Sequence, residues 1–200
     1  QYLAGKNQTH FNASTPLTLA ETASVFGEML TFKSILEQAN SKKERKALLA
    51  NKVEDMLNTV VRQIAFFQFE KEVHTLRKST ELSIDQICSI WMDVQKSSLG
   101  PSIKYEEEYK YFWSYIPHFI HSPFYVYAYA FGDCLVNSLF NTYEKGLPNF
   151  DDKYINLLKS GGSKKYNELF SPFNLNLSKK SFWKKGLNVI ESFIDELETL

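Results

Sequence analysis

Apolar residues recur at helical spacing along nearly the whole chain, and this periodicity constrains the fold more than any other feature of the sequence. A broad apolar stripe runs through residues 16–39, and another runs through residues 42–78 with the charged residues elsewhere. Residues 171–178 alternate with period two, but Pro172 and their short length favour an extended loop over a strand. The sequence therefore predicts an all-α fold.

Capping and breaking residues set the expected helix boundaries. Ser14-Thr15-Pro16 offers a capping hydroxyl and a proline suited to a first turn, while Ser83 precedes and Gly100-Pro101 follows another periodic segment. The segment 124–145 carries almost no charge in its first half, which predicts a helix buried nearly all round. Residues 101–123 are irregular and aromatic, and we expect a short helix and a loop there. The expected helices are 16–39, 42–78 (bent or split), 84–98, 124–145, 151–159, 164–170 and 180–198.

Composition bounds the domain count and excludes several classes of partner. At 200 residues we expect one helical domain over 1–200. The 23 basic and 23 acidic residues balance, so no global charge favours nucleic acid. No apolar run approaches the roughly 20 residues of a membrane span. Cys88 and Cys134 form neither a metal-pair spacing nor a disulfide framework, which favours a cytoplasmic protein. The absence of an initiator methionine suggests that residue 1 is an internal position of a longer chain.

Two glutamates, Glu21 and Glu28, are the first candidate for chemistry. Two helical turns separate them, so both carboxylates are expected near one face of the helix predicted over 16–39, a face that also carries Leu17 and Ser24. A carboxylate on an apolar stripe is costly unless it is paired or binds a cation. The alternative, which spacing by itself favours, is that both side chains point to solvent at the edge of the stripe.

Two histidines followed by alternating tyrosines are the second candidate. Tyr125 and Tyr129 share a helix face, Tyr127 points elsewhere, and His118 and His121 precede them. Imidazole and phenol groups that converge in an apolar site can donate hydrogen bonds to a developing oxyanion. An aromatic core cluster explains the same pattern equally well.

The remaining polar motifs are weak signals. The turn Ser160-Gly-Gly-Ser163 lacks the lysine and the spacing of a phosphate-binding loop. His10 and His74 have no metal-like companions, so surface or capping roles are expected. The basic run 42–46 opens an amphipathic helix and is interpreted as a solvated face.

Several segments, in this order, resemble one family. They are 19–28 (LAETASVFGE), 115–119 (YIPHF) with 123–130 (PFYVYAYA), and 159–163 (KSGGS) with the following Glu168-Leu169. Together they span most of the chain and are similar to the thimet-oligopeptidase-like zinc peptidases, and among these to bacterial oligoendopeptidase F. The resemblance implies the helical C-terminal catalytic subdomain of a zincin-like oligopeptidase.

The resemblance also implies a zinc ion and the groups around it. In that family an HExxH helix supplies two histidine ligands and the catalytic glutamate, and Glu21 matches the third ligand on a later helix. Glu28 matches a carboxylate that orients a ligating imidazole. The motif HExxH does not occur in this sequence. A segment similar to residues 1–4 usually follows the histidine helix, so the motif is expected just before Gln1.

The resemblance assigns the other candidates to the substrate. His118 matches a histidine near the substrate, and Tyr125 and Tyr129 match tyrosines that stabilise the tetrahedral intermediate, with Tyr127 in reserve. Gly161 and Gly162 match a substrate-facing loop. The family pattern is not met at Tyr166, which stands where proline is expected. His121 stands where relatives vary, so no catalytic role is expected for it.

The implied function is that of a zinc endopeptidase that hydrolyses short peptides in a channel between helical lobes. Without HExxH, this chain by itself is expected to be zinc-poor and inactive. We expect Glu21 to face inward, across from His118 and Tyr125. The alternative is a non-catalytic helical interaction module that keeps the fold, and a nucleic-acid binder is disfavoured by the zero net charge. Apolar surface exposed by truncation could also cause dimerisation.

Overall fold

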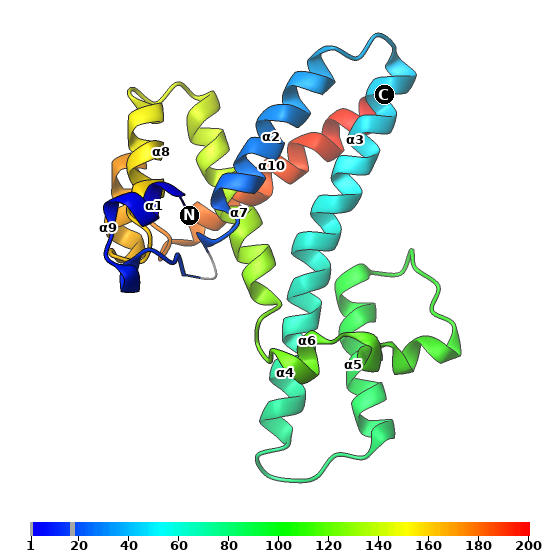
Figure 1. Cartoon of the computed structure of the whole chain (residues 1–200). Coiled ribbons are helices and arrows are strands. Elements are labelled where there is room, and N and C mark those ends of the chain that lie inside the picture. Colours follow the sequence, from blue (N-terminus) through cyan, green and yellow to red (C-terminus); the bar gives the residue numbers. More distant parts are fainter. Residues whose placement is uncertain (1, 17–18) are drawn as a thin grey trace. The chain divides into compact units, whose positions relative to one another are not determined.

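The computed structural model describes residues 2–16 and 19–200 as helices joined by loops (Figure 1). Gln1 and Leu17, which entered the sequence predictions, lie outside the described residues. The described residues contain no β-strand, so the all-α prediction is confirmed. The chain divides into two compact units, Gln1–Glu54 with Phe131–Leu200, and Asp55–Ala130. The single domain predicted over 1–200 stays a prediction.

The first unit is built around helix α7 (Tyr127–Glu144), and every residue from 132 to 140 in this helix is buried. Phe140 packs edge-on against Phe26 with their ring centroids 5.7 Å apart, and Tyr154 packs against the same Phe26 ring at 4.6 Å. Burying one such ring stabilises the fold by about 1.5–3 kcal/mol. The prediction of a helix buried nearly all round is confirmed. The other elements of this unit are α1 (Tyr2–Asn7), the 3-10 helix η1 (His10–Asn12), α2 (Thr22–Glu37), most of α3 (Lys42–Leu57), α8 (Phe150–Lys159), α9 (Tyr166–Phe170), the 3-10 helix η5 (Ser171–Phe173) and α10 (Lys180–Thr199).

Helix α10 approaches α7 closely within the first unit. A Cβ atom added to Gly186 would lie 2.5 Å from the carbonyl oxygen of Cys134, which is far inside van der Waals contact. The approach buries the apolar face of α10 on both sides of the glycine. The buried residues of this helix are Phe182, Gly186, Val189, Ile190 and Phe193.

The second unit contains the middle of the chain. Residues 42–78 were predicted as one bent or split helix. The helical region ends at Leu76 and is divided by the five-residue π-helical segment η3. A π-helical segment adds a residue to the turn and shifts the register of the apolar face. The elements of this unit are the end of α3, η3 (Asn58–Arg62), α4 (Gln63–Leu76), α5 (Ile84–Leu99), the 3-10 helix η4 (Glu107–Tyr115), α6 (His118–His121) and the first turn of α7.

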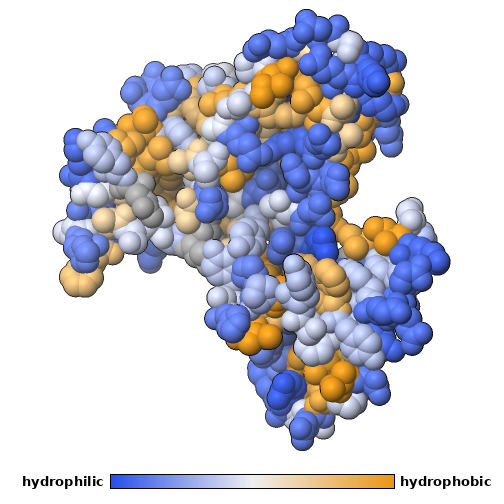
Figure 2. Space-filling view, turned by 45° about the vertical axis from the view of Figure 1, so that its right-hand side comes forward, coloured by the Kyte–Doolittle hydropathy of each residue, from blue (hydrophilic) through white to orange (hydrophobic). Residues whose placement is uncertain are grey.

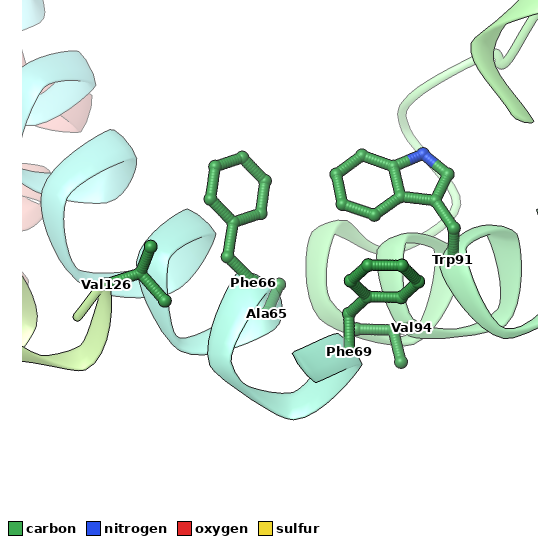
Figure 3. Close-up of a cluster of buried hydrophobic side chains, with 6 residues drawn as sticks. All are labelled: Ala65, Phe66, Phe69, Trp91, Val94 and Val126. Atoms are coloured by element: carbon green, nitrogen blue, oxygen red, sulfur yellow. The ribbon is translucent and has the colours of Figure 1, made fainter. Parts of the chain in front are cut away.

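Helices α4 and α5 lie side by side and share the core of the second unit (Figures 1 and 3). Trp91 from α5 packs edge-on against Phe69 from α4, with the ring centroids 5.2 Å apart. Its indole N–H donates to the carbonyl of Tyr109, 3.0 Å away, so the large ring is buried without losing its hydrogen bond. Figure 3 shows the cluster, which consists of Ala65, Phe66, Phe69, Trp91, Val94 and Val126.

Local signals set the ends of α5 as the sequence predicted. The backbone N–H of Gln86 donates to Ser83 Oγ at 3.3 Å, and the Ser83 N–H donates to Gln86 Oε1 at 2.8 Å, which completes a capping box. Gly100 has φ +74°, a conformation that glycine adopts without steric cost. The helix ends at Leu99 for this reason.

The start of α2 was predicted wrongly. The helix begins at Thr22 and not at residue 16. The Leu19 N–H bonds to the Pro16 carbonyl at 2.8 Å, and regular helix follows only after Glu21. Leu19 and Ala20 precede this start although they fit the helical spacing, and periodicity by itself does not separate such residues from the helix. No helix was expected at α1 or η1.

The surface mixes polar and apolar residues, and apolar patches are visible on the face shown in Figure 2. Among the large apolar side chains, Phe11, Tyr115 and Ile120 are strongly exposed. Dimerisation through such surface stays a prediction. Within residues 2–16 and 19–200 no helix is both long and apolar enough to cross a membrane.

The close approach at Gly186 makes a testable prediction. Gly186→Ala should lower the free energy of unfolding by about 1–3 kcal/mol, because backbone atoms of α7 occupy the space of the new methyl group. The matched control is Gly27→Ala in α2, where an added Cβ meets nothing within 4 Å. The control should raise stability by up to about 1 kcal/mol through helix propensity. Urea unfolding of the three chains measures both effects, and equal stability of the two variants would contradict the packing.

Candidate active site

Glu21 stands at the N-cap position of α2 in the first unit. Its side chain is exposed, and its Oε2 accepts a hydrogen bond from Ser24 Oγ at 2.7 Å. The sequence predicted that this carboxylate faces inward, whereas in the described chain it is open to solvent. Its lone pairs are therefore accessible to a cation or to another polar group, and its role as a metal ligand stays a prediction.

Glu28, two turns along α2, is held by a buried lysine. Lys52 of α3 is 8 % exposed and places its Nζ 2.5 Å from Glu28 Oε1, while the Glu28 side chain is 60 % exposed. An ammonium group in an apolar environment requires a paired carboxylate. The pair fixes one oxygen of Glu28 and leaves the carboxylate otherwise accessible, which suits the predicted role of orienting a ligand.

A buried carboxylate lies near this pair in the first unit. Asp133 of α7 is 7 % exposed and accepts a hydrogen bond from Asn137 Nδ2 at 2.8 Å. Burial raises the pKa of Asp133 to about 6, while the charge of Lys52 and the Asn137 hydrogen bond act in the opposite direction. Repulsion from Glu28 adds to the increase. The exposed Glu28 therefore interacts with two buried charged side chains, Lys52 and Asp133.

Sequence reasoning missed Lys52 and Asp133, although each leaves a signal. Lys52 occupies the apolar stripe of its helix, three residues after Leu49 and four before Met56, both of which are fully buried. Asp133 is an acidic residue in the segment with almost no charge. A charged residue at a buried register position indicates a partner that the sequence does not identify.

His118, Tyr125 and Tyr129 converge within the second unit. The rings of His118 and Tyr125 stack with centroids 5.5 Å apart and planes 28° apart. The hydroxyl of Tyr129 lies 3.3 Å from His118 Nε2, and the rings of the two tyrosines are 5.3 Å apart. All three side chains are half-buried, so packing restricts their orientation while part of each side chain remains accessible. This cluster can donate hydrogen bonds to a developing negative charge.

The other aromatic and histidine candidates lie outside this cluster. Tyr127 packs edge-on against Phe67 with the ring centroids 5.7 Å apart, as expected for a side chain on another helix face. His121 is exposed at the end of α6. The geometry favours Tyr125 and Tyr129 over Tyr127, and their catalytic roles stay predictions.

Packing explains the two glycines of the predicted substrate loop. Gly161 has φ +51°, and a Cβ atom there would lie 2.2 Å from the carbonyl oxygen of Asn12. The Gly162 N–H donates to the same oxygen at 2.8 Å, and a Cβ on Gly162 would lie 2.7 Å from the Ser14 carbonyl oxygen. Both glycines therefore permit the loop to pack against residues 12–14. Contact of Gly161 or Gly162 with substrate stays a prediction.

Among the described residues, the predicted zinc ligand is the carboxylate of Glu21. No group of three or more histidine, cysteine, aspartate or glutamate side chains in the described part of the chain could hold a metal ion. A zinc site takes at least three protein ligands. The described residues could therefore supply one zinc ligand, Glu21, to a site completed by other residues. They could not form a complete zinc site.

Solved structures share this helical fold. A crystal structure of a candidate peptidase from Chlamydophila abortus superimposes with a TM-score of 0.87 at 30 % sequence identity, over 99 % of this chain and 33 % of that chain. The crystal structure of oligoendopeptidase-F from Enterococcus faecium gives a TM-score of 0.84 at 24 % identity, which shows the fold alone. The chain therefore shares its fold with a segment of each of these two solved structures.

The family follows from the sequence match. The family model of Peptidase family M3 matches residues 1–189, so the chain belongs to this family. It is 28 % identical to the chromosomal oligoendopeptidase F of Lactococcus lactis subsp. cremoris, over 98 % of this chain and 32 % of that protein. Identity to the oligopeptidase PepF of Bacillus subtilis is also 28 %, over 100 % of this chain and 30 % of the relative. The chain spans about a third of the length of these relatives.

The buried Asp133 makes stability depend on pH. The folded chain holds the proton of Asp133 more tightly than the unfolded chain does, because the folded pKa of about 6 exceeds the ordinary value of 3.8. This stabilisation is fully present below the unfolded pKa and is lost as the pH rises through about 6. The loss should be on the order of 2–3 kcal/mol.

Asp133→Asn should abolish this part of the pH dependence, because the amide stays neutral. Urea unfolding at about pH 4 and about pH 8 measures the difference between the two chains. Asp195→Asn, an exposed change on α10, is the matched control and should keep the wild-type slope. A wild-type slope in Asp133→Asn would contradict the burial cost.

Proposed function

We propose that this chain is the substrate-facing part of a zinc-dependent oligoendopeptidase that hydrolyses short peptides. The observation that carries the proposal is the convergence of His118, Tyr125 and Tyr129 in one half-buried cluster. Membership of Peptidase family M3 supports peptide hydrolysis as the reaction. The oligoendopeptidases among the relatives support short peptides as the substrates.

The cluster suits the stabilisation of a tetrahedral intermediate. Attack on a peptide carbonyl places negative charge on its oxygen, and hydrogen-bond donors held in advance stabilise that charge without reorganising. A phenol O–H of Tyr125 or Tyr129 and an imidazole N–H of His118 are such donors. In the contact between the Tyr129 hydroxyl and His118 Nε2, one group donates the hydrogen bond and the other accepts it. The histidine tautomer therefore decides which of the two is the donor.

The role proposed for Glu21 is to supply one carboxylate ligand to zinc. When bound, a zinc ion polarises the scissile carbonyl and lowers the pKa of a bound water. Glu28 would orient a neighbouring ligand through a hydrogen bond, and Lys52 would hold Glu28 in place. The two histidine ligands and the general base are proposed to come from an HExxH helix upstream of Gln1.

We place the proposed enzyme in a reducing, cytoplasmic setting. Cys88 and Cys134 are both buried and not joined in a disulfide. Burial raises the pKa of the Cys134 thiol to about 12, and the charge of Asp133 adds to this increase. Such a thiol stays protonated and unreactive at neutral pH.

Zinc content and hydrolysis of a quenched peptide, measured for two forms of the protein, test the proposal. The chain of residues 1–200 should bind zinc poorly and should not cleave the peptide. A form extended upstream through an HExxH motif should bind one zinc ion and cleave the peptide. A folded, extended form that neither binds zinc nor cleaves would favour the non-catalytic interaction module.

Single tyrosine substitutions test the roles within the cluster. In the extended form, Tyr125→Phe or Tyr129→Phe should lower kcat by about 100-fold with little change in KM, because a hydrogen bond made in the transition state is lost. Tyr127→Phe should change kcat little, since Tyr127 packs on Phe67 outside the cluster. Steady-state kinetics measures all three, and a larger loss in Tyr127→Phe would reverse the proposed register.

A further inference from the structure

Phe124 adopts a backbone conformation that a bulky residue rarely takes. Its φ is +60°, and the other residues besides glycine with positive φ in the described chain are Asn149 and Asn174. Asparagine tolerates this left-handed region, whereas the Cβ atom of a phenylalanine there lies close to the following carbonyl oxygen and the conformation is strained. Such a residue persists only where its surroundings hold it.

A buried carboxylate on α4 holds this residue. The backbone N–H of Phe124 donates to Glu70 Oε1 at 2.8 Å, and Glu70 is 2 % exposed. One helical turn further along α4, the ring of His74 packs against the ring of Phe124 with the centroids 4.9 Å apart. Two successive turns of one helix therefore contact both the backbone and the side chain of Phe124.

The burial of Glu70 is costly and is not needed for packing. Burial raises its pKa, while the Phe124 N–H and the charges of His74 and His118 act in the opposite direction. Its second oxygen, Oε2, is buried and has no hydrogen-bond partner among the described residues. A leucine would fill a similar volume without the cost of a buried polar group. The carboxylate is therefore explained by its bond to Phe124 and not by the core.

Residues 119–124 connect two members of the cluster, His118 and Tyr125. His118 directly precedes Phe119, whose ring packs against Phe69 of α4 with the centroids 5.1 Å apart. Tyr125 directly follows Phe124, which Glu70 holds on the same helix. Each of these two cluster members therefore has a neighbour in sequence that is fixed on α4. A short turn closes the path between them: the Ser122 N–H bonds to the His118 carbonyl at 3.0 Å, and the Tyr125 N–H bonds to the Ser122 carbonyl at 3.2 Å.

We infer that Glu70 is a positioning residue, which holds Phe124 in the left-handed conformation and thereby sets the stacking of Tyr125 on His118. The catalytic consequence of this arrangement rests on the proposed function, whereas the positioning itself does not. Loss of the acceptor releases the Phe124 backbone to a more favourable φ, and this rotates the next residue, Tyr125, away from the imidazole.

Nuclear magnetic resonance on this chain tests the positioning without requiring activity. In the wild-type chain the Phe124 amide should exchange with solvent at least about tenfold more slowly than in an unstructured peptide, because its N–H is bonded to a buried carboxylate. Exchange at the unstructured rate would overturn the inference, whatever the variants do.

Three variants define what Glu70 contributes. Glu70→Gln keeps an oxygen acceptor and should keep both the amide protection and the imidazole signal of His118, which is assigned by comparison with His118→Ala. Glu70→Leu should lose the protection and shift the His118 signal towards that of an exposed histidine. Glu72→Leu, the same change at an exposed position of α4, is the control and should shift neither.

The outcomes of the variants separate the alternatives. An unchanged His118 signal in a folded Glu70→Leu would overturn the inference, and so would loss of that signal in Glu70→Gln. If Glu70→Leu does not fold, the wild-type exchange rate and Glu70→Gln decide the question.

Kinetics in a hydrolytically active, extended form tests the consequence for catalysis. Glu70→Leu should lower kcat by roughly 10–100-fold with KM near the wild-type value, and Glu70→Gln should restore most of the rate. A shifted His118 signal with an unchanged kcat would defeat the role proposed for the cluster and leave the positioning by Glu70 intact. A wild-type extended form without activity would defeat the proposed function, and the resonance measurements would still test Glu70.

Discussion

The burial of carboxylates inside apolar helix packing is the constraint on which the rest of this structure depends. Each unit is held by aromatic and aliphatic contacts, and each also encloses one acidic side chain, Asp133 in the first and Glu70 in the second. An ionised group in such surroundings opposes folding unless specific partners compensate for its lost hydration. The partners are an amide and a nearby ammonium group for Asp133, and a backbone N–H for Glu70.

Both carboxylates lie close to the residues to which family resemblance assigns chemistry. Lys52, whose charge acts on Asp133, pairs with Glu28, the proposed orienting group. Glu70 bonds to the residue that directly precedes Tyr125. Each network therefore places a buried polar group, which weakens the core, next to a residue with a proposed role in catalysis. Glu21, by contrast, is exposed, and the zinc role proposed for it requires further ligands, which the described residues do not supply.

Local chemistry made much of the fold predictable. The helical class, the capping box at Ser83, the stop at Gly100 and the nearly complete burial of α7 all follow from patterns within a few residues. The start of α2 was wrong because Leu19 and Ala20 precede the helix, although their spacing also fits its apolar stripe. In the candidate site, three residues could be proposed from their residue types and from family resemblance, namely His118, Tyr125 and Tyr129. Lys52, Asp133 and Glu70 could not, because their partners are distant in sequence.

The sequence by itself determined the secondary structure class, the family and the side chains able to do chemistry, since periodicity, capping and motifs are local properties of the chain. Only the tertiary structure decided that Tyr129 contacts His118, while Tyr127 packs on Phe67. It also decided that Glu70, which is 54 positions away in sequence, accepts a hydrogen bond from the Phe124 N–H. The physical reason is that hydrogen bonds and burial depend on distance in space, and the packing of α4 against the segment after η4 sets that distance.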